Sequence, residues 1–251
     1  MLMLRFRDCL IVRGRHAYKS QYPAIPKSAI YIKFSTMKVY FVSGLAADGR
    51  VFKNIKLPDG CVPVFLEWIA PHKNESLQKY ALRLAEGIDT SEPFAIVGLS
   101  MGGMISSEIA RQYKPVVTIL ISSVPGSKQL PFYFKAAGSI RLHKLVPVSL
   151  VKRAARYKRL FTTETAEDKQ VLYSIINDSD DKFIYWAMDA ILKWRSEQLP
   201  QPYIHIHGTH DEVLPIRFTT PTHIISKGGH LMVMNRAREI NAILQTALLN
   251  C

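Results

Sequence analysis

Residues 94–103 read FAIVGLSMGG, in which an apolar run passes directly into a G-x-S-x-G pattern. The apolar run predicts a buried strand, and Gly102 begins a stretch that predicts a helix. On such a turn the Ser100 hydroxyl would project over the carboxyl edge of a sheet, while Gly98 and Gly102 carry no Cβ atom to collide with neighbouring backbone. The helix start also directs N–H groups at developing negative charge. This stretch therefore predicts that Ser100 is a nucleophile; a glycine-rich turn without catalysis is the alternative.

The chain around this stretch alternates between strand-like and helix-like segments. Short β-branched or aromatic runs predict strands at residues 38–42, 62–66, 94–97, 116–121, 203–207 and 222–225. Helical periodicity is clearest at residues 76–86, 102–112 and 237–249. In the first of these helices, Leu77, Tyr80, Ala81 and Leu84 share one face. The alternation predicts the α/β class, with a mostly parallel sheet flanked by helices.

The alternation stops between residues 124 and 200, which we interpret as a helical insertion. Amphipathic helical stretches occur there at residues 148–160 and 182–194, without any strand pattern. The predicted organisation is a basic N-terminal extension (residues 1–36), a first core part (37–123), the insertion (124–200) and a second core part (201–251).

Two later motifs supply the partners that a nucleophilic serine needs. The run HGTHDEVLP, residues 207–215, follows a predicted strand, and Asp211 is our candidate for the acid that orients an imidazole; Glu212 is its nearest competitor. A run GGH that ends at His230 follows the last predicted strand, where a loop can place an imidazole over the serine. The chain order is thus nucleophile Ser100, then acid, then base.

With these three motifs the chain resembles the α/β-hydrolase family over about residues 37–251. VGLSMGG is similar to the family's nucleophile elbow, HGTHDEVLP to its acid loop and GGHLMV to its histidine loop. The resemblance implies an α/β-hydrolase fold and a catalytic triad of Ser100, Asp211 and His230. It places the insertion where the family has a variable cap, and it implies no cofactor.

The resemblance also implies an oxyanion hole made of two backbone N–H groups. The family usually has His-Gly before the first donor, whereas this chain reads Ser43-Gly44-Leu45. Because the donor is a backbone amide, the serine need not remove it. By position, Leu45 and Met101 are the expected donors.

The histidines near the predicted acid allow a different interpretation. His205, His207, His210 and Asp211 form a dense cluster, and a strand would place His205 and His207 on one face, as two metal ligands require. The cluster resembles the H-x-H-x-D-H run of metallo-β-lactamase-like hydrolases, but here histidine precedes the aspartate and the run lies near the C-terminus. We favour histidines that flank a triad acid, and metal-dependent hydrolysis is the alternative.

The composition predicts a soluble globular protein without a membrane span. A chain of 251 residues that is 48% hydrophobic can bury one sizeable core. Cys9, Cys61 and Cys251 form neither a disulfide framework nor a CxxC pair, which favours a cytoplasmic location. No stretch approaches the roughly 20 apolar residues that cross a bilayer.

The net charge of +13 is concentrated in two blocks. Residues 1–36 carry seven Lys or Arg residues against Asp8 alone. We favour translated sequence ahead of a true start at Met37, with a mitochondrial presequence and a basic arm for a polyanion as alternatives. Residues 128–160 carry nine Lys or Arg residues and no acid. This block is either a solvated helix face or a surface for an anionic substrate, and we expect no nucleic-acid partner.

The motifs together predict a serine hydrolase that cleaves a carboxylic ester or thioester of a small molecule through an acyl-enzyme on Ser100. Carbon–carbon bond hydrolysis also fits the motifs, and a triad-bearing small-molecule receptor with little turnover is the alternative from another class. Aromatic residues of the insertion are expected either to line an apolar acyl site or to pack its helices: Phe132, Tyr133, Phe134, Tyr157, Phe161, Tyr173, Tyr185, Trp186 and Trp194. No pattern in the sequence predicts an oligomeric state.

Overall fold

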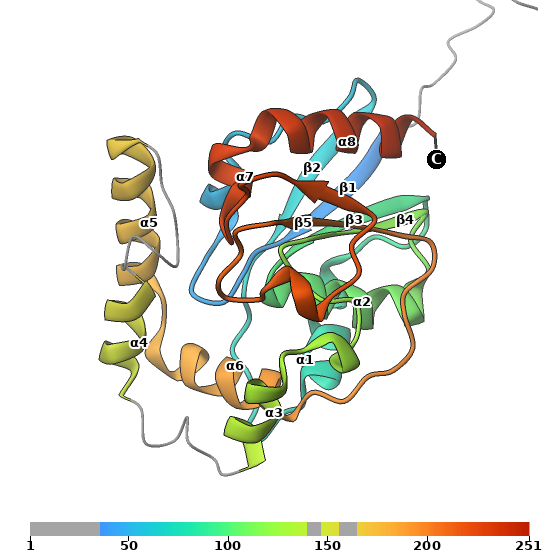
Figure 1. The fold of residues 1–251 in the computed structure, drawn as a ribbon. Helices are drawn as coiled ribbons and strands as arrows, with labels where there is room; N and C mark the ends of the chain where they lie inside the picture. The colour runs from blue at the N-terminus through green and yellow to red at the C-terminus, as the bar shows by residue number, and fades with distance from the viewer. Residues whose placement is uncertain (1–35, 140–146, 156–164, 251) are drawn as a thin grey trace, which may run out of the picture. The chain divides into compact units, whose positions relative to one another are not determined.

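Six parallel strands form one sheet in the order β2-β1-β3-β4-β5-β6 (Figure 1). The structure is a computed structural model that describes residues 36–139, 147–155 and 165–250. The strands are β1 (Met37–Val42), β2 (Cys61–Leu66), β3 (Phe94–Leu99), β4 (Val117–Ile121), β5 (Tyr203–Gly208) and β6 (His223–Ile225). Each lies where the sequence predicts a strand, and no end differs by more than two residues.

The strand order changes direction at β1, and this change decides where a site can form. β2 pairs with one side of β1 and β3 with the other, so that Val42 lies beside Gly98 near the carboxyl ends. The loops that leave β1 and β3 therefore turn to opposite sides and open a crevice between them. The predicted oxyanion loop directly follows β1, and the predicted nucleophile directly follows β3.

Helices cover both faces of the sheet (Figure 1). The α-helices are α1 (Leu77–Leu84), α2 (Met101–Tyr113), α3 (Phe132–Ser139), α4 (Val148–Ala155), α5 (Ala166–Asp178), α6 (Asp181–Lys193), α7 (Met232–Asn235) and α8 (Ala237–Leu249). Short 3-10 helices are η1 (Gly49–Phe52), η2 (Ala85–Gly87), η3 (Ser127–Gln129) and η5 (Ile216–Phe218). The buried residues of α1 are the four predicted to share one face, and the Ser76 side chain caps its first turn by accepting a hydrogen bond from the Lys79 amide.

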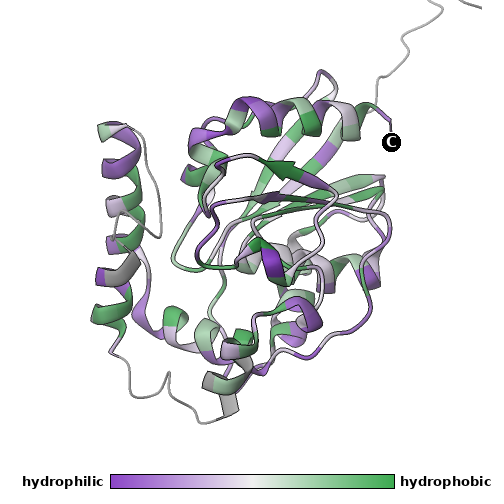
Figure 2. Ribbon diagram, viewed as in Figure 1, coloured by the Kyte–Doolittle hydropathy of each residue, from purple (hydrophilic) through white to green (hydrophobic). Residues whose placement is uncertain are grey.

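The strands divide their side chains between two apolar cores, as the two-residue period of a strand requires. Tyr40, Val42 and Ile96 belong to the core that includes buried residues of α1, α2 and α6. Phe41 and Val97 belong to the opposite core, which includes buried residues of η1, α5, α7 and α8. Figure 2 shows the result, with hydrophobic strands inside helices of mixed character.

Between β4 and β5 the described residues form helices and no strand, in agreement with the predicted helical character of the insertion. The predicted helix at residues 182–194 corresponds to α6. Its neighbour at residues 148–160 is described over Val148–Ala155 as α4, and the rest lies outside the described residues. Within this basic block, Lys152 forms an ion pair with Asp181 (2.6 Å).

Residues 1–35 lie outside the described residues, and so do residues 140–146 and 156–164 of the insertion. The first basic block, apart from Thr36, and five of the nine Lys or Arg residues of the second therefore lie outside the structure described. Among the helices that the structure does describe, none combines the length and the apolar character needed to cross a bilayer.

Candidate active site

Ser100 stands on the sharp turn between β3 and α2. Its backbone has φ 53° and ψ −119°, a conformation that residues other than glycine rarely adopt. Two hydrogen bonds hold the turn: the Ser100 amide donates to the Ile121 carbonyl (2.9 Å), and the Ser123 hydroxyl donates to the Ser100 carbonyl (2.6 Å). The end of β4 and the loop that follows it therefore fix both the amide and the carbonyl of the strained residue.

Gly102 allows this turn to lie against the end of β1. A Cβ atom at this position would lie 2.1 Å from the Ser43 carbonyl oxygen and 2.2 Å from that of Val42. No side chain fits at such a distance, so the close approach of the two backbones requires glycine. The sequence prediction that glycine removes a backbone collision at this position agrees with the structure.

His230 reaches Ser100 from the loop between β6 and α7. Its Nε2 lies 2.8 Å from the Ser100 Oγ, and its Nδ1 lies 2.8 Å from Oδ2 and 3.0 Å from Oδ1 of Asp211. The imidazole and the carboxylate are both buried. The structure thus brings together the three residues that the motifs single out, in one hydrogen-bonded line.

Asp211 is held in place by its own loop. Its Oδ1 accepts hydrogen bonds from the amides of Val213 (2.9 Å) and Leu214 (2.8 Å). Burial alone would raise the pKa of this carboxyl, but the attraction and hydrogen bond of His230 outweigh it, so the pKa of Asp211 lies below its ordinary value. The carboxylate is therefore ionised beside the imidazole, whereas the competing acid Glu212 is exposed to solvent.

Two further histidines extend this buried line. His207 Nε2 lies 2.7 Å from the Leu214 carbonyl oxygen and 3.4 Å from Oδ2 of Asp211, and His207 Nδ1 lies 3.2 Å from Nε2 of His205. Desolvation lowers the pKa of His207, although the neighbouring Asp211 opposes this shift. Desolvation and the neighbouring His207 together lower the pKa of His205 to about 3. Both rings are therefore neutral at pH 7.

The structure does not assemble the histidine cluster as a metal site. His210 is exposed, while His205 and His207 are buried and bonded to each other. Within the described ranges, no group of three or more His, Cys, Asp or Glu side chains is arranged to hold a metal ion. The geometry supports the interpretation of these histidines as neighbours of the acid.

The loop after β1 lies directly beside Ser100. A Cβ atom on Gly44 would lie 3.4 Å from the Cβ of Ser100, so the next residue, Leu45, stands at the edge of the crevice. Met101 opens α2, where an amide has no acceptor within its own helix. In the part of the chain that is described, the amides of Leu45 and Met101 donate to no other backbone oxygen. A pair of oxyanion donors has to be available in this way.

Hydrogen bonds from two side chains close this loop on itself. The Ala47 carbonyl oxygen accepts from the Ser43 hydroxyl (2.9 Å) and from Trp68 Nε1 (2.7 Å), and the Ala47 amide donates to the Gly44 carbonyl (3.0 Å). Ser43 thus has a structural use at the position where the family usually has histidine. Sequence reasoning did not find Trp68, because no local pattern reveals that an indole 21 residues away reaches this carbonyl.

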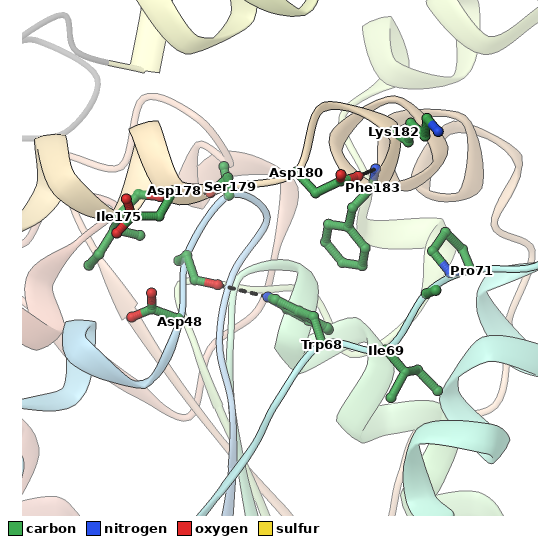
Figure 3. Close-up of a pocket in the computed structure, with 13 residues that line it drawn as sticks. Asp48, Trp68, Ile69, Pro71, Ile175, Asp178, Ser179, Asp180, Lys182 and Phe183 are labelled. Carbon is green, nitrogen blue, oxygen red and sulfur yellow. Dashed lines mark hydrogen bonds between the residues drawn. The ribbon is translucent and has the colours of Figure 1, made fainter.

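A cavity of about 490 Å³ lies next to this loop (Figure 3). Its apolar lining residues are Ala46, Ala47, Trp68, Ile69, Ala70, Pro71, Ile175 and Phe183. Its polar lining residues are Asp48, Asp178, Ser179, Asp180 and Lys182. They come from the loop after β1, the segment after β2 and the junction of α5 with α6. Of the insertion aromatics singled out in the sequence, none belongs to this described lining; Trp186 and Trp194 pack in the core instead.

No protein-family model matches the chain, and no curated protein matches it. Solved structures, in contrast, do match the chain. A thermophilic esterase from Thermogutta terrifontis is 16% identical, with a TM-score of 0.62 over 85% of this chain and 90% of its own. MenH from S. aureus is 13% identical, with a TM-score of 0.65 over 86% and 94%. An esterase from Exiguobacterium antarcticum is 19% identical, with a TM-score of 0.64 over 84% and 91%. Together with the all-parallel sheet, these similarities show that the chain has the α/β-hydrolase fold.

Proposed function

We propose that this protein is a serine hydrolase that cleaves a carboxylic ester or thioester of a small molecule. The observation that carries the proposal is the buried line from Ser100 Oγ through His230 to Asp211, in which both contacts of the imidazole measure 2.8 Å. A serine with a base at one side and an ionised acid behind that base is the arrangement for nucleophilic acyl transfer. The fold shared with two esterases supports the same chemistry.

In the acylation step His230 Nε2 takes the proton of Ser100 as Oγ attacks the carbonyl carbon. The carbonyl π electrons move to oxygen, and the amides of Leu45 and Met101 donate hydrogen bonds to the oxyanion. When the tetrahedral intermediate collapses, the bond to the leaving oxygen or sulfur breaks, and the imidazolium returns its proton to that atom. The product alcohol or thiol departs and leaves an ester on Ser100.

Water resolves the acyl-enzyme by the same steps in reverse order. His230 takes a proton from water, the hydroxide adds to the acyl carbon, and Ser100 Oγ leaves with the proton that the imidazole gives back. Asp211 fixes the tautomer with a proton on Nδ1 and stabilises the imidazolium in both steps. These residues complete the cycle with no cofactor in the scheme.

Steady-state turnover of acetyl esters and thioesters tests this proposal. The wild-type protein should release product over many cycles, and Ser100→Ala should lose the reaction while keeping its melting temperature. A receptor with a vestigial triad would complete at most a few cycles and then stop. Activity that survives Ser100→Ala but disappears with a chelator and returns with Zn²⁺ would instead establish the metal-dependent alternative.

A further inference from the structure

We propose that the cavity beside the oxyanion loop binds a compact, uncharged apolar group of the substrate, with Trp68 and Phe183 as the residues that set its size. The inference rests on the proposed ester hydrolysis and adds a substrate class to it. A volume of about 490 Å³ lies within the range of ~300–1,000 Å³ that is usual for ligand sites.

One short loop connects the wall of the cavity with the proposed reaction centre. Ala46 and Ala47 line the cavity, Leu45 is the proposed oxyanion donor, and Gly44 lies against the Ser100 side chain. A group attached to a carbonyl that sits in the oxyanion hole can therefore extend over this loop into the cavity.

The inner wall of the cavity is aromatic. The rings of Trp68 and Phe183 lie 5.0 Å apart, and Figure 3 shows both at the cavity, with Ile69 beside Trp68 and Ile175 at the opposite end. The one polar atom of the indole is satisfied by the Ala47 carbonyl, so its ring offers apolar surface only. Such a wall favours hydrocarbon over polar groups.

The charges at the rim argue against an anionic group inside the cavity. Asp48, Asp178 and Asp180 are lining residues, against Lys182 as the cation among the described lining residues. Arg50 bridges the first two carboxylates, with contacts of 2.6 and 2.7 Å. The Asp180 side chain accepts a hydrogen bond from the Phe183 amide and caps α6. With Arg50 and Lys182 counted, the three carboxylates still exceed the cations by one, and this excess disfavours a further negative charge.

Trp68 also connects the cavity to catalysis. Its N–H is one of two donors that hold the Ala47 carbonyl, and therefore the loop with the proposed donor Leu45. Trp68 is in this respect a positioning residue. Trp68→Phe keeps an aromatic wall but removes the donor, so kcat should fall about tenfold while KM changes less than twofold. A tenfold rise in KM with an unchanged kcat would mean that the indole acts only as a wall.

Two series of esters test the cavity itself. In one series the acyl chain grows from acetyl to octanoyl on p-nitrophenol; in the other the alcohol grows on acetate. We expect kcat/KM to rise roughly threefold per methylene in one of the two series, because each methylene leaves water for an apolar site. The series that responds identifies the substrate group that enters the cavity.

Ala70→Trp provides the decisive variant, because Ala70 lines the cavity and is solvent-exposed, so an indole there fills the site without disturbing the core. In this variant kcat/KM should no longer rise with chain length. Ala242→Trp, at an exposed position of α8, is the matched control and should keep the gain. Phe183→Leu serves as a second cavity variant and should extend the gain to bulkier groups.

The outcomes separate this inference from the proposed function. No turnover of any ester by the wild type would overturn the proposed function itself. Turnover of acetate with an unchanged chain-length profile in both Ala70→Trp and Phe183→Leu would overturn the cavity inference alone. An ester with an ω-carboxylate on the group that enters the cavity should react at least tenfold more slowly than its uncharged analogue. An equal or faster reaction would contradict the uncharged character of that group.

Discussion

Ser100 holds a backbone conformation that costs a serine about 1–3 kcal/mol. The Ile121 carbonyl and the Ser123 hydroxyl fix it there, and the benefit is an Oγ that lies 2.8 Å from the His230 imidazole. Strain of this kind persists where the surrounding structure over-determines it, which is typical of functional sites.

Asp211→Asn should lower kcat by about 10⁴-fold without unfolding the protein. An amide at this position can present an N–H to His230 Nδ1 and favour the wrong tautomer, and it no longer stabilises the imidazolium. Steady-state kinetics of an acetyl ester would measure the loss, and Glu212→Gln is the matched control because its side chain is exposed. Full activity in Asp211→Asn combined with loss in Glu212→Gln would show that the acid is misassigned.

His205 should make the protein less stable as the pH falls. Its pKa is about 3 in the folded state, against 6.5 for an ordinary histidine. Between these two values the unfolded chain binds a proton that the folded chain does not, so the free energy of unfolding decreases with falling pH, by up to about 1.4 kcal/mol per pH unit for this group. Urea denaturation at pH 7 and pH 4.5 measures the slope.

His205→Gln removes this titration while keeping a nitrogen donor for His207. The slope of unfolding free energy against pH should be shallower in this variant than in the wild type. An identical slope in His205→Gln and the wild type would mean that the buried ring is protonated in the folded state.

At the residue scale, sequence motifs predicted some residues of the candidate site but could not predict others. Ser100, Asp211 and His230 are each embedded in a recognisable local pattern, and the structure brings them together. Trp68 and Phe183 have no such pattern. Their importance arises from contacts between segments far apart in the chain, and only a folded structure reveals such contacts.

At the scale of elements, the junction of β3 and α2 depends on its glycines. Gly102→Ala should destabilise the protein by at least about 3 kcal/mol, because its Cβ atom would lie 2.1 Å from a backbone oxygen that cannot move aside. A loss of that size corresponds to a melting temperature lower by roughly 6–12 °C for a domain of this size. Differential scanning calorimetry measures the shift.

Gly87→Ala is the matched control for this prediction. A Cβ atom there would meet only the Leu66 side chain, at an ordinary contact distance of 3.6 Å. Its melting temperature should stay within about two degrees of the wild type. Equal stability of Gly102→Ala and the wild type would show that β1 and the turn after β3 lie further apart than described.

The strands were the most predictable elements, because short runs rich in β-branched and aromatic residues stand between turn signals. Phe94–Leu99 is buried along its whole length, as expected for a central parallel strand. The cavity at the junction of α5 and α6 was not predictable in this way. Amphipathicity indicates that a helix has an apolar face, but it does not tell which loop of the core that face will meet.

At the scale of the whole molecule, the net charge of +13 comes mainly from two basic blocks. The block at residues 1–36 is described only at its last residue, Thr36, and in the second block Lys152 is engaged with Asp181 and with the Ser179 carbonyl. The hypothesis of an anionic substrate therefore stays a prediction about the outer surface of the insertion. The cavity inference concerns a different part of the substrate.

We propose that residues 1–36 are dispensable. β1 begins at Met37 and has a hydrogen-bonded neighbour on each side, so a chain that starts at Met37 retains every strand of the sheet described. Its melting temperature and its ester kcat/KM should match those of the full chain. A melting temperature lower by many degrees would mean that the segment at residues 29–34, which alternates like a strand, contributes to the fold.

The central claim is that Ser100 is the nucleophile, and labelling with a fluorophosphonate followed by peptide mapping tests it most directly. The reagent forms a stable phosphonyl ester only with a serine that its surroundings activate. We predict one label, on Ser100, which disappears in Ser100→Ala and persists in the neighbouring control Ser43→Ala. A label on Ser43 or Ser122, or a label that persists in Ser100→Ala, would contradict the account.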